Sequence, residues 1–509
     1  MSKFNKNKEK LTTHEGGRGY HRDLLKQWVN FMMGSRIESG FYEDANWFEQ
    51  QIKHLTEEII NTYGAGYASK VAIFSRDVLG MRSVSQFVAA MLNSYAFEGK
   101  RAFYARFFSR PDDVAEVFAI IESYGWKRSH ALIRGAADYI SSLNSYTLGK
   151  YKLARKNFNM YDIVNITHAH SAAIDQFKNG TLEAPDTWEV AISADMSQEE
   201  REREWLRLVM EGKLGYMALL RNLRNIGEAY SAQFKNLANP AAFVDELVSQ
   251  LTNEQKIRGS KVFPYRIFTA YRQVSQLNRW SFNGCYVEQV TVALEKAFVI
   301  ATDNVPEFEG RNVVILDVSG SMEQSISERS EVSVLEASAC QALIMILRNP
   351  DTAVIKFGAK AVVSTKYNDA KASPFKYIEY LCDNEGCGHA TVLDAVIPFL
   401  QIMDSIDRIF LYSDMQVMSR RSPWGFETKN FNSWICNHRN VYVYSYDLGM
   451  YNTSAVSDSD QFMFISALND AIYELVPYFE QEDGIGKFIA AAVKPLSLDV
   501  GSVKQKTED

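Results

Sequence analysis

The sequence predicts a chain in two parts, a HEAT-like α-helical solenoid followed by an α/β domain with a doubly wound parallel sheet. Over the first 300 residues, short apolar stripes recur at helical spacing and strand-like alternation is scarce. After residue 311, short apolar runs alternate with helical patterns, as in parallel sheets covered by helices. A length of 509 residues is enough for two or more domains.

The helical part is punctuated by polar, glycine and proline residues, which favours successive short helix pairs without a strong sequence repeat. Such stacks curve and offer extended binding surfaces. Helices are expected at residues 24–33, 52–60, 71–79, 84–92, 114–124, 129–143, 205–209, 216–226, 241–251 and 287–300.

Charge is unevenly divided along the chain. Residues 311–509 carry 17 Lys and Arg against 26 Asp and Glu, whereas the residues before them carry 38 against 36. The α/β part therefore has a net charge of −9 and the part before it +2, which together give the −7 of the chain. Within the near-neutral helical part, residues 127–156 hold seven basic residues and a single acid, Asp138. This concentration is typical of a surface that binds polyanions.

Three segments supply candidate RNA contacts. Residues 126–139 are predicted to form one helix, which would place Lys127, His130 and Arg134 on one face. Lysine and arginine neutralise phosphates, and tyrosine or histidine stacks on unpaired bases. A solvated helical face is the alternative interpretation. The candidates are Lys127, Arg128, His130, Arg134, Lys150, Lys152, Arg155, Lys156, His168 and His170.

In the α/β part, Asp317, Ser319 and Ser321 directly follow the apolar run 313–316. A carboxylate and two hydroxyls suit a hard cation such as Mg²⁺, which takes oxygen ligands. Further strands are expected at 353–358, 408–412 and 441–447, with a helix at 332–347. Ligands bind outside the carboxyl ends of parallel strands, although the hydroxyls could equally cap loops and helices.

The pattern Asp-x-Ser-x-Ser at a strand end resembles the metal-ion-dependent adhesion site (MIDAS) of von Willebrand factor A domains. In that family a threonine and an aspartate complete the site, and the resemblance carries these roles to Thr391 and Asp414. It implies a divalent cation, Mg²⁺, as cofactor. Cys382, Cys387 and His389 lack a clear fourth ligand, so incidental thiols are favoured over a zinc site.

No apolar run reaches the length of a membrane span, and the lysine-rich start has no apolar signal-peptide core. Five cysteines without a disulfide-like framework fit reduced thiols. We therefore expect a cytoplasmic protein without a membrane span.

Several helical segments resemble, in order, the TROVE module of the Ro family. The most recognisable is Tyr216-Met217-Ala218-Leu219-Leu220-Arg221-Asn222-Leu223-Arg224, whose polar residues are expected to tie helices together rather than to contact RNA. The other segments are residues 30–42, 125–139, 150–152, 161–168, 262–266 and 293–298.

The resemblance implies a monomeric ring of HEAT-like helical pairs closed by the A-like domain. The expected parts are a flexible basic arm (1–18), the TROVE helical domain (19–305), the A-like domain with its MIDAS motif (306–495) and a polar tail (496–509). Two positions depart from the family: His389-Ala390-Thr391 replaces Gly-Gly-Thr, and Ser413-Asp414-Met415 replaces Thr-Asp-Asn.

The family resemblance also implies a function. Small structured Y RNAs would bind a basic outer surface, and single-stranded 3′ ends of misfolded noncoding RNAs would enter a central hole. The role would be RNA quality control without catalysis, with an exoribonuclease such as polynucleotide phosphorylase as partner. A metal-dependent protein-binding adaptor is the alternative. A nuclease is not favoured, because paired metal-binding carboxylates with a nearby base are not evident.

Overall fold

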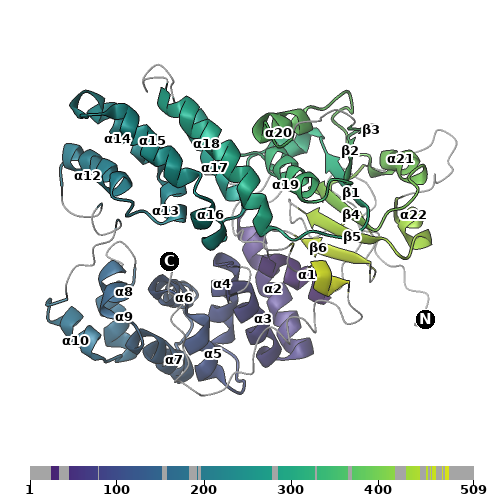
Figure 1. Cartoon of the computed structure of the whole chain (residues 1–509). Helices are drawn as coiled ribbons and strands as arrows, with labels where there is room; N and C mark the ends of the chain where they lie inside the picture. The colour runs from purple at the N-terminus through teal and green to yellow at the C-terminus, as the bar shows by residue number, and fades with distance from the viewer. Residues whose placement is uncertain are drawn as a thin grey trace, which may run out of the picture. The chain divides into compact units, whose positions relative to one another are not determined.

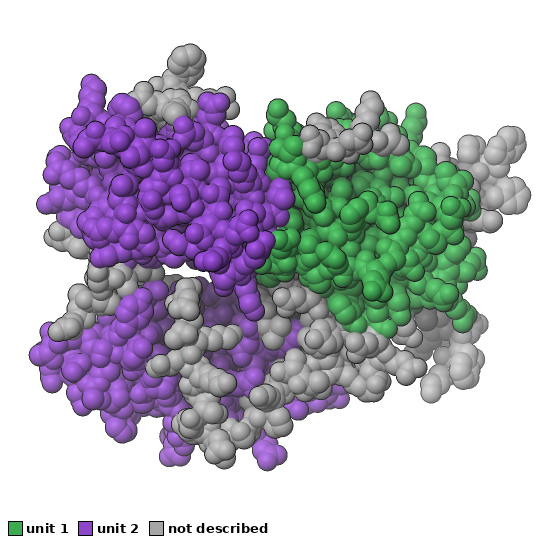
Figure 2. Space-filling model, in the orientation of Figure 1, with its two compact units in different colours: residues 1–51, 263–268, 302–482 green, residues 52–262, 269–301, 483–509 purple. Residues whose placement is uncertain are grey.

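The fold was analysed in a computed structural model (Figure 1). It describes residues 24–33, 45–77, 80–151, 157–182, 188, 192, 196–277, 285–326, 330–364, 370–418, 431–447, 454–456, 459, 461–465, 473 and 476–480. The chain divides into two compact units, coloured green and purple in Figure 2. The α/β unit groups residues 1–51, 263–268 and 302–482, and the helical unit groups residues 52–262, 269–301 and 483–509.

In the described residues of the α/β unit, the sheet has six strands in the order β3-β2-β1-β4-β5-β6. All neighbours pair in parallel except β2 and β3, which are antiparallel. The predicted parallel sheet is thus confirmed, with one antiparallel edge strand added. The strands are β1 (Asn312–Asp317), β2 (Ala353–Phe357), β3 (Ala361–Val363), β4 (Arg408–Ser413), β5 (Tyr442–Asp447) and β6 (Phe462–Ile465).

Helices cover both faces of this sheet (Figure 1). Alternate residues of β1 face opposite sides, as the pleat of a strand requires. Val313 and Ile315 join an apolar core with Leu400 and Ile435, and α19 contacts β1 from the other side. The elements that flank the strands are η3 (Gly320–Glu323), α19 (Val334–Arg348), α20 (Pro374–Cys382), η4 (Leu393–Val396), α21 (Ile397–Gln401), α22 (Phe431–Asn437) and α23 (Val476–Phe479).

The first helix, α1 (Leu24–Met33), belongs to the α/β unit and packs beside β6. Trp28, Phe31 and Met32 are fully buried, and the Lys26 ammonium donates to the backbone oxygen of Ser459 at 2.8 Å. Covering β6 protects the edge of a sheet, which otherwise exposes unpaired backbone groups. The predicted boundaries assigned α1 to the helical domain, so the units of the structure differ from them at this end.

The helical unit is a succession of short helices, many of which pack on the next but one. One row contains α3, α5, α7 and α9, and α4 packs on α6. This is the contact pattern of stacked helix pairs. The helices are α2 (Ala45–Tyr63), α3 (Ala65–Asp77), α4 (Ser83–Leu92), α5 (Lys100–Phe107), α6 (Pro111–Ser123), α7 (His130–Ser141), α8 (Ser145–Lys150), α9 (Met160–Thr167), α10 (Ala172–Lys178), α12 (Gln198–Met210), α13 (Tyr216–Arg221), α14 (Leu223–Gln233), α15 (Pro240–Leu251), α16 (Glu254–Gly259), α17 (Pro264–Ser275) and α18 (Cys285–Ala301).

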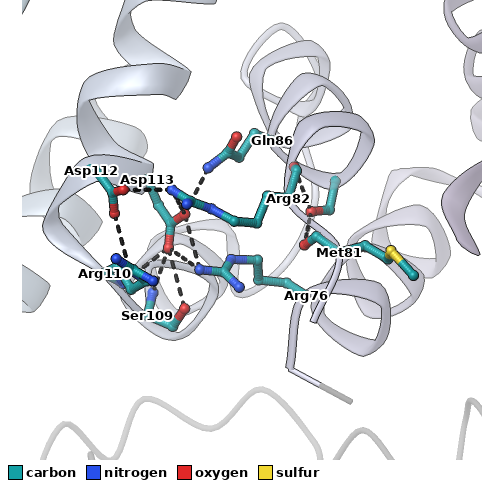
Figure 3. A network of polar contacts seen from close by, with 9 residues as sticks. Arg76, Met81, Arg82, Gln86, Ser109, Arg110, Asp112 and Asp113 are labelled. Atoms are coloured by element: carbon teal, nitrogen blue, oxygen red, sulfur yellow. Dashed lines mark hydrogen bonds and ion pairs between the residues drawn. The ribbon is translucent and has the colours of Figure 1, made fainter. Parts of the chain in front are cut away.

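Asp113, in the first turn of α6, is the polar centre of this stack (Figure 3). It is fully buried and accepts from Arg76 Nη2 of α3 at 2.8 Å and from Gln86 Nε2 of α4 at 2.7 Å. The backbone nitrogens of Ser109 and Arg110 donate to the same carboxylate at 3.2 and 3.0 Å. A buried charge needs such partners, so this carboxylate ties three helices together.

Most of the predicted helices coincide with helices of the structure, but the single helix expected over residues 216–226 is wrong, because Asn222 separates α13 from α14. The stripe at 24–33 is confirmed by α1, that at 84–92 by α4, and that at 241–251 by α15. In the part of the chain that the structure describes, no helix combines the length and apolarity needed to cross a membrane. The predicted arm (1–18) and tail (496–509) lie outside the described residues.

Candidate functional site

The residues of the predicted MIDAS lie at the carboxyl edge of the sheet. Asp317 ends β1, Asp414 follows β4, and both are fully buried. Ser319 and Thr391 are also buried, and the Ser319 hydroxyl lies 3.4 Å from that of Ser321. The backbone nitrogen of Gly320 donates to the carbonyl of residue 389 at 3.3 Å, which holds the loop of Ser319 and Ser321 beside the segment that carries Thr391.

Neutral groups hold the Asp317 carboxylate. The Ser413 hydroxyl donates to Oδ2 at 2.6 Å and the Ser319 backbone nitrogen donates to Oδ1 at 2.9 Å. Burial, together with the nearby Asp414 carboxylate, raises the pKa of Asp317 to about 7 against the opposing effect of these hydrogen bonds. Two carboxyls and three hydroxyls form an all-oxygen donor set, which fits a hard divalent cation.

Asn384 joins the two loops that carry these donors. Its Nδ2 donates to the carbonyl of Val318 at 2.9 Å and to that of Gly388 at 3.1 Å, while its Oδ1 accepts from the Gly388 nitrogen at 2.9 Å. Neither Asn384 nor Ser413 was predicted as a site residue. The only signal in the sequence was their position, in a polar turn and beside Asp414.

The glycines of this edge are sterically required. A Cβ at Gly358 would lie 2.1 Å from the Gly388 carbonyl oxygen, so any other residue would push the two loops apart. Gly388 itself has φ of +79°, a left-handed conformation that favours glycine. The close approach of these backbones brings the Thr391 segment to the sheet, because Val392 N donates to the Gly358 carbonyl at 2.9 Å.

On the helical unit, the prediction of one helix over residues 126–139 is wrong at its start. The helix α7 begins at His130, because the Ser129 hydroxyl accepts from Leu132 N at 3.3 Å as an N-cap. Lys127 and Arg128 therefore lie in the preceding loop. His130 and Arg134 are on α7, and both are exposed.

Asp138, the single acid among residues 127–156, forms an ion pair with a residue outside that segment. Arg101 of α5 donates to both of its oxygens at 2.6 Å. The helices α5 and α7 approach closely at Gly135, where a Cβ would lie 2.5 Å from the Arg101 carbonyl oxygen. Arg101 thus neutralises the one acid among residues 127–156.

Lys150 ends α8 and is partly buried. Its ammonium lies 6.0 Å from the ring of Tyr146 and 5.6 Å from that of Tyr151. Tyr146 is 51% exposed, which places an aromatic ring on the surface beside a cation. Such a pair suits a nucleic acid, since the ring can stack on a base while the ammonium meets a phosphate. Tyr146 was not among the predicted residues.

His168 and His170 follow α9, and both are exposed. His168 ends the helix in a left-handed conformation, with φ of 55°. The backbone nitrogen of His170 donates to the Ser141 hydroxyl at 3.2 Å, which anchors this turn to the end of α7. Lys152, Arg155 and Lys156 lie outside the described residues.

The family model of the TROVE domain matches residues 169–289. Over this segment the chain is similar to TROVE domains. The match includes His170 and two of the expected TROVE segments, at 216–224 and 262–266, and it begins just after the basic segments.

Two curated relatives of the chain are named RNA-binding protein RO60. The chain is 29% identical to the protein of Caenorhabditis elegans over 149 residues, 26% of this chain and 22% of that protein. It is 29% identical to the protein of Deinococcus radiodurans over 146 residues, 28% of this chain and 27% of that protein. The matched segments thus span about a quarter of these relatives.

The fold of the chain is similar to that of a solved structure. The crystal structure of Deinococcus radiodurans RO (RSR) protein matches with a TM-score of 0.61. The match covers 88% of this chain and 98% of that chain at 15% sequence identity. The predicted combination of a helical solenoid with a parallel-sheet domain is confirmed by this likeness.

Proposed function

We propose that this chain is an RNA-binding protein. The observation that carries the proposal is the exposed basic and aromatic surface that leads into the TROVE match. His130, Arg134, His168 and His170 are all exposed there, and Arg101 removes the only opposing charge of the segment. Phosphate contacts of this kind supply affinity without reading sequence.

The finer proposal is that small structured Y RNAs bind this surface and that single-stranded 3′ ends of misfolded noncoding RNAs bind in the hole of a monomeric ring. The names of the RO60 relatives support RNA as the ligand class. The chain would act by binding rather than catalysis, in the cytoplasm, and would hand its RNA to an exoribonuclease such as polynucleotide phosphorylase. Recognition would depend mainly on shape and phosphate contacts.

The proposed cofactor is Mg²⁺ at the MIDAS edge. Asp317, Ser319, Ser321, Thr391 and Asp414 would supply oxygen ligands, and the ion would supply an open coordination position for a partner's carboxylate. The support is chemical: the donor set is all oxygen, and the pKa of Asp317 is raised in the absence of a compensating cation.

The test replaces Lys150, Arg155 and His168 together by alanine. Affinity for a small structured RNA is expected to fall by at least about tenfold at moderate salt, and the slope of log affinity against log salt is expected to become shallower by about two. The thermal melt is expected to stay nearly unchanged, because Lys150 and His168 are not core residues. Equal RNA affinity in the variant would reject this surface as the site.

A metal-dependent protein-binding adaptor is the second candidate, favoured by the MIDAS edge itself. An adaptor of this kind would form a complex with a partner protein that EDTA dissociates and that salt hardly affects. RNA binding that survives EDTA, with no protein captured in Mg²⁺, would reject it.

A further inference from the structure

A hollow of about 380 Å³ opens in the helical unit where the end of α6, the start of α7 and the end of α9 meet. Trp126, Ile133 and Ile166 give it apolar walls, and Lys127 and Arg128 add two cations. We propose that this hollow holds one unstacked nucleobase of a single-stranded RNA segment, while Lys127 binds the neighbouring phosphate. The proposal rests on the proposed RNA-binding function and adds to it a site for a base.

The walls are rigid enough to receive a flat ring. Trp126 stacks on Tyr124 with ring centroids 4.5 Å apart and an interplanar angle of 25°. Tyr124 in turn meets Phe87 edge to face at 5.8 Å. The indole is thereby fixed from one side and remains partly exposed. Bases stack on such aromatic surfaces regardless of their sequence.

Arg128 is held in place before any ligand binds. Its guanidinium lies 5.1 Å from the ring of Phe118 and 4.9 Å from that of Phe158. Within the described residues, its Nε is buried without a hydrogen-bond partner. The nearest carboxylate, Glu122, is 3.8 Å away and largely exposed. Because the guanidinium is ordered by the two rings, contact with an RNA oxygen costs little further side-chain entropy.

The backbone that presents Lys127 is fixed in the same way. Asn93 of α4 donates from Nδ2 to the Lys127 carbonyl at 2.8 Å, and its Oδ1 accepts from Ser129 N at 2.9 Å. The Lys127 side chain is exposed at the rim. The following helix, α7, places its positive end and the exposed His130 beside it.

The lining favours a base over a phosphate inside the hollow. Glu122 contributes a carboxylate to the lining, which would repel a phosphate but not an uncharged base. The volume is at the low end of the 300–1,000 Å³ range of ligand pockets, so it suits one base and its sugar rather than a paired stem. Unpaired RNA is the form whose bases are free to enter.

The experiment compares three labelled RNAs on the full chain: a blunt hairpin, the same hairpin with a short 3′ single-stranded extension, and that extension with abasic sites. The extension is expected to strengthen binding by about fivefold or more, and the abasic version to lose this gain. Ile133→Gln and Ile166→Gln are expected to lose the gain while binding the blunt hairpin normally. Ile402→Gln, at an isoleucine that is 77% exposed in the other unit, is the matched control.

A second readout keeps the result independent of variant stability. With 4-thiouridine in the extension, photocrosslinks in the unmodified chain are expected within the peptide that contains Trp126 and Ile133. Crosslinks elsewhere, or an extension that adds no affinity, would overturn the base site while leaving blunt-hairpin binding intact. Failure of the blunt hairpin to bind would instead reject the proposed function, and the base site with it.

Discussion

Each unit contains a buried carboxylate, but the groups that surround the two carboxylates differ in charge. Asp113 of the helical unit accepts from the Arg76 guanidinium, the Gln86 amide and two backbone nitrogens. Among the described residues, Asp317 of the α/β unit accepts from neutral groups, the Ser413 hydroxyl and Ser319, and lies near a second buried carboxyl at Asp414. Both carboxylates are fully buried.

The difference distinguishes a carboxylate whose charge the chain compensates from one whose charge it does not. The negative charge of Asp113 is compensated within the chain, so its loss would leave Arg76 buried and unpaired. Asp317 and Asp414 place two acids together, which costs stability unless a proton or a cation joins them. Burial alone therefore does not distinguish the two sites; the sign of the neighbouring groups does.

The largest effect is expected from Asp113→Ala. Removing this carboxylate leaves the 7%-exposed Arg76 without its counter-charge, and breaking a buried pair in this way costs about 3–5 kcal/mol. Hydrogen exchange measured at increasing urea concentration should show the loss of stability in α3, α4 and α6. The control is Glu199→Gln, which breaks an exposed pair with Arg203 and should cost about 0.5 kcal/mol or less. Similar losses in both variants would contradict the distinction.

The next largest effect is expected on the stability of the α/β unit as the pH changes, because of Asp317. Its folded pKa of about 7 is above the unfolded value of about 3.9, so the fold favours the protonated form. The contribution of this group to stability is complete below the unfolded pKa and is lost as the pH rises through about 7. The metal-free α/β unit is therefore expected to melt lower at about pH 8 than at about pH 6.

Mg²⁺ should reverse that trend, because it binds the ionised carboxylate. Saturating Mg²⁺ at one hundred times its Kd would add about 2.7 kcal/mol, and more of this gain should appear above pH 7 than below it. Asp317→Asn should melt higher than the unmodified chain at alkaline pH without Mg²⁺ and gain nothing from Mg²⁺. Differential scanning calorimetry decides both points, and an Asn variant that still responds to Mg²⁺ would remove the ion from this site.

The position of Asp317 could be predicted from the sequence, whereas the role of Asp113 could not, for a physical reason. Asp317 and the strand ends were predictable, because the pattern Asp-x-Ser-x-Ser follows a buried apolar run and parallel strands collect their carboxyl ends at one edge. Asp113 was not predicted as a centre of the helical unit. Its partner Arg76 lies 37 residues away, and no local pattern couples them.

The start of α7 shows the same limit at short range. Residues 126–139 have helical spacing, but Ser129 caps the helix and Asn93, from another helix, holds the loop before it. The periodicity of a segment does not show which of its residues a distant side chain will hold in a loop. Residues of this loop line the hollow that is proposed to hold a base, so the hollow could not be predicted from the sequence either.

Asn384→Ala tests how the MIDAS edge is positioned. The amide makes one hydrogen bond to Val318 of the other loop and two to Gly388 of its own loop, but it contributes no proposed ligand. Losing an outer support of this kind is expected to weaken Mg²⁺ binding by about 10–100-fold while the sheet still folds. Isothermal titration with Mg²⁺ gives the affinity, and Asn437→Ala, at an exposed asparagine of the same unit, is the control. Unchanged affinity would mean that the loops hold their positions without Asn384.

The smallest effect is expected from Asp138→Asn, which examines a carboxylate that is paired like Asp113 but near the surface. Arg101 is 44% exposed, so losing the pair should cost about 1 kcal/mol or less. The released guanidinium adds a positive charge beside the basic segment, and RNA affinity at low salt is expected to rise by about twofold, with a steeper salt dependence. Fluorescence anisotropy over a salt series measures it. A loss of stability comparable to that of Asp113→Ala would show that pairing, rather than burial, sets the cost. Unchanged RNA affinity would show that Asp138 lies away from the surface that binds RNA.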